Sequence, residues 1–110
     1  MTTLKKLSIY TSEGSRSGTR SLHIAIIATA LEQGLYSAIA VKAIAGFGPQ
    51  MAIPTTNHMA LDSDLPIEVR ILAPATAIEA FLTAYEAMLT GCIITQEDIE
   101  VMQAPLLVTA

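Results

Sequence analysis

The chain has 110 residues, about the length of one domain, which argues against separate cofactor and substrate domains. Hydrophobic residues make up 52% of it and charged residues only 15%, against about 25% charged in an average soluble domain. A small domain with so few charges exposes apolar surface, so we expect an oligomer. Ten acidic and six basic residues give a net charge of −4, which argues against a sequence-independent grip on nucleic acid phosphates.

The start of the chain and its cysteine content indicate the compartment. MTTLKKLSIY lacks the long apolar core of a secretory signal, and no stretch approaches the roughly 18 apolar residues that span a bilayer. The single cysteine, Cys92, allows no internal disulfide and has no C-x-x-C partner, so we expect a small buried thiol. These features predict a cytoplasmic protein without direct membrane insertion.

The first half of the chain predicts a strand, a helix and a second strand. Residues 7–10 alternate with period two and lead into a loop over residues 11–21. A helix is expected from about Thr19 or Ser21 to Gln33, closed by Gly34, and its apolar residues surround nearly the whole circumference. A strand over residues 38–45 follows, with Ile39 and Val41 on one face and Lys42 on the other.

The second half repeats this order after a loop over residues 46–56. Strands are expected over residues 58–61 and 65–72, separated by a bulge or turn at 62–64. Pro74 suits the first turn of a helix with one apolar stripe, which consists of Ile78, Phe81, Leu82, Tyr85, Met88 and Leu89. After Gly91 we expect a turn at Thr95–Asp98 and a last strand through Ile99, Glu100 and Val101.

The two halves share the order strand, helix, glycine, strand, and Gly34 and Gly91 close the two helices. Two right-handed β-α-β units whose middle strands form a hairpin give a four-stranded antiparallel sheet with both helices on one face. The sequence therefore predicts an α+β fold, the ferredoxin-like βαββαβ sandwich, in a single domain over residues 1–110. Its core spans about 4–102 and its tail 103–110.

Candidate functional residues fall into an anionic-ligand group and a cation group. Arg16 and Arg20 precede a helix N-terminus, where an anion is favoured; alternatively both pair with Glu13 or with acids of a neighbouring subunit. Lys42 and Arg70 project from strands and could line a ligand cleft, with Glu68 as a polar partner.

The cation group is less specific. His58, Asp62 and Asp64 could hold a cation if they shared a face, although a solvated turn explains them better because no metal-ligand spacing is matched. His23 is expected to be a packed or interface histidine. The sequence contains no nucleophile elbow, dinucleotide fingerprint or P-loop, so we do not expect an enzyme.

Several segments, in order, resemble a family of PII-like proteins known mainly as a domain of unknown function, over about residues 4–102. The segments are Leu7-Ser8-Ile9-Tyr10 with Glu13, Arg20-Ser21-Leu22, Ile44-Ala45-Gly46-Phe47-Gly48, Asp64-Leu65-Pro66-Ile67 with Val69, Ile78-Glu79-Ala80-Phe81-Leu82, and Gly91 with Thr95, Glu97-Asp98 and Ile99-Glu100-Val101.

The resemblance implies a PII-like homotrimer whose sheets face inward and whose loop after the second strand projects like the PII T-loop. It further implies that an adenine nucleotide or similar anion binds between subunits near Gly46, Phe47 and Gly48, as a regulatory ligand rather than a tightly bound cofactor. One departure concerns the segment 90–98, which has one glycine and no lysine where PII proteins carry a Gly-rich, Lys-containing loop. This argues against ATP binding in the PII manner.

The function expected from these observations is a small-molecule sensor that regulates a partner protein, such as a membrane transporter or metabolic enzyme. Its partner-binding loop spans residues 48–57 and includes Pro49, Gln50, Met51 and Ile53. The alternatives are a trimeric protein for divalent-cation binding or tolerance on the same fold, and a structural adaptor without a small ligand.

Overall fold

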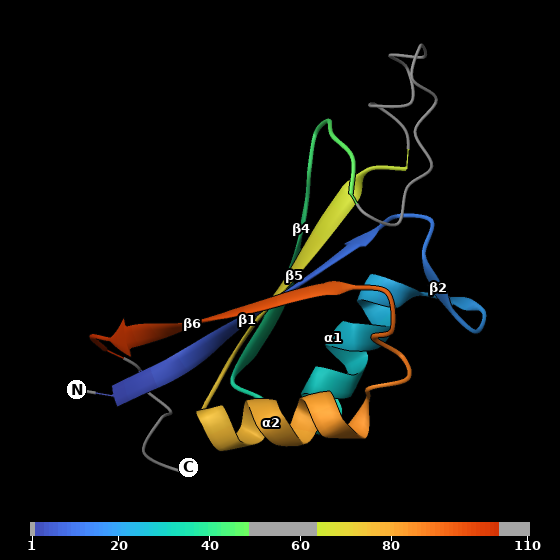
Figure 1. The fold of residues 1–110 in the computed structure, drawn as a ribbon. Coiled ribbons are helices and arrows are strands. Elements are labelled where there is room, and N and C mark those ends of the chain that lie inside the picture. Colours follow the sequence, from blue (N-terminus) through green and yellow to red (C-terminus); the bar gives the residue numbers. More distant parts are fainter. Residues whose placement is uncertain (1, 49–63, 104–110) are drawn as a thin grey trace.

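A computed structural model describes residues 2–48 and 64–103 (Figure 1). In chain order its elements are β1 (Thr2–Ser12), β2 (Arg16–Ser17), β3 (Arg20–Ser21), α1 (Leu22–Glu32), β4 (Ser37–Lys42), β5 (Pro66–Ala73), α2 (Ala75–Ala84) and β6 (Ile93–Val101). Among the residues that the structure describes, neither helix is long and apolar enough to cross a bilayer.

Four strands form one antiparallel sheet in the order β4-β5-β1-β6. β1 lies at the centre and pairs with β5 on one side, where Ile9 faces Val69, and with β6 on the other, where Ile9 faces Ile94. The units β1-α1-β4 and β5-α2-β6 are therefore interleaved, which confirms the predicted ferredoxin-like α+β sandwich.

Both helices pack on the same face of the sheet and enclose the core. The buried cluster contains Leu7 and Ile9 of β1, Ile67, Val69, Ile71 and Ala73 of β5, Leu22, Ile26 and Ala30 of α1, Ile78 and Phe81 of α2, and Leu89. In β5, odd-numbered residues are buried and even-numbered residues are partly exposed, as the alternation of apolar and polar residues predicts. The core is built chiefly from the two central strands, because each of them is covered by a helix.

Of the two glycines expected to close the helices, only Gly34 does so, because α2 ends at Ala84, well before Gly91, with Tyr85 as its C-cap. Gly34 follows α1 with a φ of 72°, and Gly91 lies before β6 with a φ of 87°. A residue with a side chain adopts this left-handed conformation only at a steric cost. The repeated order of strand, helix, glycine and strand is therefore a repeat in structure.

The structure corrects the predicted loop over residues 11–21. β1 continues to Ser12, and β2 and β3 form a small hairpin in which Arg16 faces Ser21 and Ser17 faces Arg20. Gly18, at the tip, has a φ of 63°, which a two-residue hairpin turn of the primed type requires. The polar composition of this segment resembles that of a loop because so short a hairpin buries almost no apolar side chains.

Three other element boundaries also differ from the sequence prediction. Thr95–Asp98 lies inside β6 and pairs with Ser8–Lys5 of β1, rather than forming a turn. α2 ends at Ala84, so Met88 and Leu89 lie in the turns that follow it. β4 ends at Lys42 rather than at residue 45, while the predicted strand over 58–61 lies outside the described residues.

The second face of the sheet, which no helix covers, is hereafter the open face. Register places on it Tyr10 of β1, Ile39 and Val41 of β4, Glu68 and Arg70 of β5, and Ile93 and Glu97 of β6. Ile39 is 50% exposed, Val41 38% and Ile93 49%, so apolar side chains on both edge strands lie uncovered. This is the apolar surface that the composition predicts.

Candidate functional site

The ends of β1, β4 and β5 meet through the contacts of one group of residues. We call this group of residues, Glu13, Gly14, Lys42, Asp64 and Leu65, the strand-end junction. The backbone N–H of Glu13 donates to the Leu65 carbonyl at 3.0 Å. Its carboxylate accepts the Leu65 N–H at 2.9 Å through Oε1 and Lys42 Nζ at 3.1 Å through Oε2. One glutamate therefore connects the ends of β1, β4 and β5.

The electrostatics of the junction favour an ionised Glu13. The hydrogen bond from the Leu65 N–H, followed by that from Lys42, holds the pKa of Glu13 below its usual range. The Glu13 side chain is 37% exposed and that of Lys42 56%, so solvent screens the pair. The junction is thus a hydrogen-bonded contact on the surface rather than a buried ion pair.

Asp64 forms the second connection between β1 and β5 in the junction. Its Oδ1 accepts the Gly14 N–H at 2.6 Å, and its φ is 48°, in the left-handed region. A Cβ placed on Gly14 would lie 2.8 Å from that oxygen, closer than real Cβ atoms come, so a side chain at this position would force the Asp64 carboxylate to shift. Asp64 thus has a structural role in this subunit.

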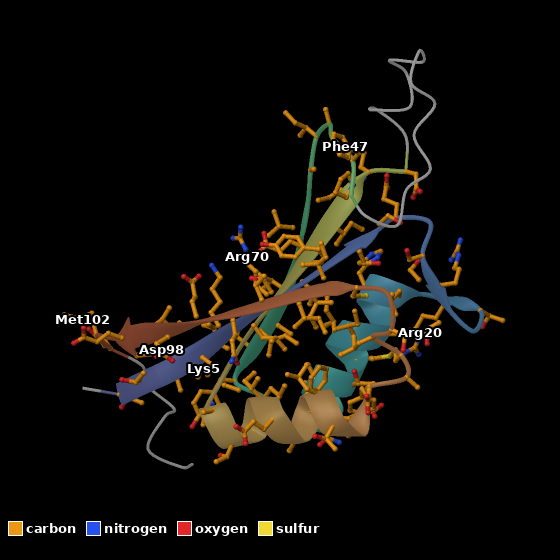
Figure 2. All side chains as sticks on the ribbon, in the orientation of Figure 1. Lys5, Arg20, Phe47, Arg70, Asp98 and Met102 are labelled. Atoms are coloured by element: carbon orange, nitrogen blue, oxygen red, sulfur yellow. The ribbon has the colours of Figure 1, made fainter. Side chains whose placement is uncertain are left out.

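The predicted ligand residues 46–48 lie beyond the end of β4. Gly46 has a φ of 143°, and a Cβ there would make only ordinary contact with Pro66. Residues 43–48, which follow β4, are hereafter the β4 arm. Phe47 is 65% exposed and lies at the outer end of this arm (Figure 2). Lys42, the predicted cation of the same group, has Glu13 as its counter-ion.

The predicted anion site at Arg16 and Arg20 lies on the hairpin beside the N-terminus of α1. Residues that face each other across an antiparallel pair share a face, so the two arginines lie on opposite faces of the ribbon. Arg16 Nη1 donates to Ser21 Oγ at 3.3 Å. Neither arginine pairs with Glu13, the alternative partner considered from the sequence, because that carboxylate is held by Lys42.

Within one subunit, the predicted ligand residues fall into two separate groups. Arg20 lies in the hairpin and Phe47 at the far end of the β4 arm (Figure 2).

Only part of the alternative cation site lies within the described residues. Asp64 is described, while His58 and Asp62, like Pro49, Gln50, Met51 and Ile53, lie outside the described residues. Residues 2–48 and 64–103 contain no group of three His, Cys, Asp or Glu side chains that could hold a metal ion.

An ion pair lies in the middle of the open face. Arg70 Nη2 donates to Glu68 Oε1 at 3.2 Å, which confirms the partner predicted for Arg70. This hydrogen bond lowers the pKa of Glu68, and partial burial opposes the shift without overcoming it. Ile39 and Val41 of the edge strand face Arg70 and Glu68, so apolar and charged side chains alternate across this surface.

Replacing Glu68 with glutamine should make stability less sensitive to acid. The folded state lowers the pKa of Glu68, so the contribution to stability is present above about pH 4.3, the ordinary glutamate value, and is lost as the pH falls through the folded-state pKa. Between about pH 5 and 3, the free energy of unfolding should therefore fall more steeply in the wild type than in Glu68→Gln. Urea unfolding at a series of pH values measures this, with Glu79→Gln, an exposed residue of α2, as the control. Parallel curves for wild type and Glu68→Gln would contradict the prediction.

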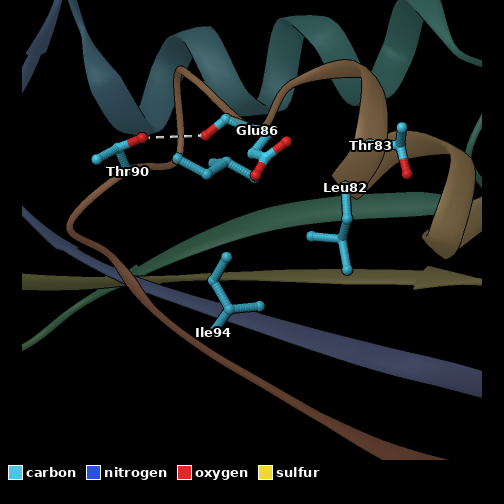
Figure 3. A pocket seen from close by; sticks show the side chains of 6 residues that line it. Leu82, Thr83, Glu86, Thr90 and Ile94 are labelled. Carbon is cyan, nitrogen blue, oxygen red and sulfur yellow. Dashed lines mark hydrogen bonds between the residues drawn. The ribbon is translucent and has the colours of Figure 1, made fainter.

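A shallow groove that the sequence did not reveal lies between the end of α2 and β6 (Figure 3). It has a volume of about 570 Å³ and is lined by Leu82, Thr83, Glu86, Leu89, Thr90 and Ile94. Thr90 Oγ1 donates to the Glu86 carbonyl at 3.3 Å, a contact between two of the lining residues. Two of these residues, Leu82 and Leu89, belong to the apolar stripe that the sequence predicts. The groove appears only because α2 stops at Ala84 and β6 begins at Ile93.

The sequence did not reveal that Glu13 connects the ends of three strands. The sequence places it next to two arginines, three and seven positions away, and that proximity suggested the wrong partners. Its contacts are to residues 29 and 52 positions distant. No local pattern carries that information, because it depends on how the strands pair.

The family model DUF190, described as "Uncharacterized ACR, COG1993", matches residues 4–101. A relative in Aquifex aeolicus (strain VF5), named "UPF0166 protein", is 34% identical over 98 residues, which cover 89% of this chain and 92% of the relative.

Among solved structures, the fold is similar to that of CPII, a nitrogen regulatory PII-like protein from Thiomonas intermedia K12. The form bound to ADP, AMP and bicarbonate has a TM-score of 0.62 and 14% identity, and the match covers 93% of this chain and 91% of that one. The form bound to ADP, AMP and acetate has a TM-score of 0.60 and 18% identity, with 92% and 90% covered. At these identities the likeness concerns the fold. The chain belongs to the DUF190 family and has the fold of PII-like proteins.

Proposed function

We propose that this protein is a PII-like regulatory protein that binds an adenine nucleotide or a similar anion between the subunits of a homotrimer. The observation that carries the proposal is the shared fold with CPII, whose solved forms hold ADP, AMP and bicarbonate. The match runs over 93% of this chain, so it includes the sheet and both helices rather than a fragment. Because one fold can host many unrelated functions, the proposal also depends on features of this chain.

Two features of the described residues support an assembly with a ligand between subunits. The open face presents Ile39, Val41 and Ile93 uncovered, as expected of a surface that packs against other copies. In addition, the predicted ligand residues lie in two groups that one subunit does not bring together. Assembly would let the hairpin of one subunit approach the β4 arm of its neighbour.

We propose a cytoplasmic binding protein rather than an enzyme. No motif for nucleophilic catalysis or for a resident cofactor occurs in the sequence. Nucleotide binding would act on a partner protein, such as a transporter or metabolic enzyme, through the connecting segment that begins at Gly48. The ligand can switch that partner only if it binds two states of the segment with different affinity.

Calorimetric titration of the purified protein with ADP, AMP, ATP, cyclic AMP and bicarbonate at fixed ionic strength tests the proposal. We expect saturable binding of at least one adenine nucleotide. Since Arg16 and Arg20 lie on opposite faces of the hairpin, Arg16→Ala and Arg20→Ala should differ. The arginine that contacts the ligand should cost at least about tenfold in affinity, the effect of losing a hydrogen bond to a charged group.

The matched control for these variants is Lys5→Ala. Lys5 pairs with Asp98 at 2.6 Å on the β1-β6 side of the sheet, away from the hairpin and the β4 arm (Figure 2). This variant should bind as the wild type does. Absence of binding to every nucleotide would refute the proposal, and equal binding by all three variants would refute the role of the arginines.

A further inference from the structure

Glu13 already forms an ion pair with Lys42, the predicted ligand-binding cation at the end of β4. Lys42 is the last residue of β4, four positions before Gly46, and its ammonium group lies 3.1 Å from Glu13 Oε2. The other oxygen of the same carboxylate accepts the Leu65 N–H at 2.9 Å. An anionic ligand approaching this end of β4 therefore meets a lysine that has a counter-ion within its own subunit.

The strand-end junction carries a net negative charge while Glu13 is paired with Lys42. Glu13 and Asp64 carry negative charge and Lys42 the compensating positive one. Asp64 is committed to the Gly14 N–H at 2.6 Å. With Glu13 in place, an incoming phosphate or bicarbonate faces a net negative surface. The ligand gains an attractive partner at Lys42 only when Glu13 withdraws.

The geometry permits that exchange. The side chains are 37% and 56% exposed, and the pair is close to solvent, so either group can rotate outward without opening the core. Exposed ion pairs of this kind contribute little to stability, which keeps the cost of breaking the contact small. A deeply buried pair would not exchange partners in this way.

We propose that Glu13 is an internal competitor for the anionic ligand at Lys42, and that ligand binding replaces the Glu13–Lys42 pair with a ligand–Lys42 pair. The inference rests on the proposed function, since it concerns how the same ligand is admitted. Because one carboxylate holds both Lys42 and the Leu65 N–H, its withdrawal also frees the Leu65 N–H, just before the start of β5. Ligand occupancy is thereby linked to the junction, and linkage requires that the effect be reciprocal.

The test compares Glu13→Gln with the wild type. Glutamine keeps an oxygen that can accept the Leu65 N–H and removes the charge that holds Lys42. ADP affinity, measured by calorimetry at fixed ionic strength, should rise about 2- to 5-fold, the range that follows from removing an exposed ion pair. The matched control is Asp98→Asn, because Asp98 pairs with Lys5 at 2.6 Å on the helix side of the sheet, away from the open face. That variant should bind ADP unchanged.

A second readout follows the junction itself. Amide hydrogen exchange at Leu65, measured by NMR, should become about 2- to 10-fold faster in the wild type on saturation with ADP, the effect of losing one hydrogen bond. Lys42→Gln should abolish this response, since the ligand then has no reason to displace Glu13. This variant changes only an exposed side chain, so it keeps the test available if Glu13→Gln does not fold.

The outcomes separate the inference from the proposed function. If the wild type binds ADP but Glu13→Gln binds it equally or more weakly, the competitor role is refuted while the nucleotide-binding proposal stands. If no protein binds ADP, the nucleotide proposal fails and inorganic pyrophosphate becomes the probe. Faster exchange at Leu65 with pyrophosphate would then support the competitor role, and unchanged exchange would refute it.

Discussion

Phe81→Ala should lower the free energy of unfolding by about 3–5 kcal/mol, the largest effect we expect from a single change in the core. Phe81 has no exposed surface and belongs to the buried cluster between α2 and the sheet. Its ring lies 5.1 Å from that of Tyr85, at 48° to it. Alanine would remove the apolar burial, leave a cavity and lose the ring contact. Urea unfolding at fixed protein concentration measures the change.

The chain offers a control of the same residue type. Phe47, the other phenylalanine, is 65% exposed, and Phe47→Ala should change stability by less than about 0.5 kcal/mol. The fixed protein concentration matters because assembly adds to the apparent stability of an oligomer. A small effect of Phe81→Ala, similar to that of Phe47→Ala, would mean that α2 does not pack as the structure has it.

Ile39→Lys should dissociate the proposed trimer into single chains. Ile39 is half exposed on the open face and faces Arg70 across the β4-β5 pair. Packing the open faces against each other would bury a lysine beside another cation, and symmetry repeats the cost in every subunit. Size-exclusion chromatography with light scattering should show the mass fall from three chains to one.

The neighbouring residue gives the matched control for this variant. Ala40 is also exposed on β4 but faces Val69, so it projects to the helix side of the sheet. Ala40→Lys should leave the assembly intact. A trimeric Ile39→Lys protein would refute assembly through the open faces. Dissociation by both variants would instead place the interface along the edge of β4.

The fold was predictable because its decisive signals are local. In β5, polar and apolar residues alternate, and burial follows that alternation from Pro66 to Ala73. Gly34 closes α1 as expected, since the left-handed conformation favours glycine wherever it occurs. Two copies of strand, helix and strand, with right-handed crossovers, then leave few arrangements of the sheet.

The errors in the fold occur where local composition and tertiary environment disagree. Thr95–Asp98 is polar on both sides of the chain, so its alternation carries no strand signal. It forms a strand because β1 supplies a partner for its backbone along the whole of β6. Both faces of this edge strand are largely exposed, so polar residues fit both of them. The hairpin of β2 and β3 escaped prediction for the same reason.

The candidate site was less predictable than the fold. The sequence identified the cations and the glycines but did not indicate which carboxylate pairs with each cation. Arg16 and Arg20, close in sequence, lie on opposite faces of a ribbon, while Lys42 meets Glu13 from 29 positions away. Such pairings depend on strand register, and a shift of register by one residue moves every side chain to the other face.

By itself, the sequence determined the ferredoxin-like fold and the surplus of apolar surface, because periodicity, glycine positions and composition are properties of the chain. Tertiary structure alone decided which face of the sheet lies open and which carboxylate neutralises Lys42. It also decided that Glu13 links the ends of three strands. Each of these depends on contacts between residues far apart in the chain, which form only when the strands pair and the helices cover one side of the sheet.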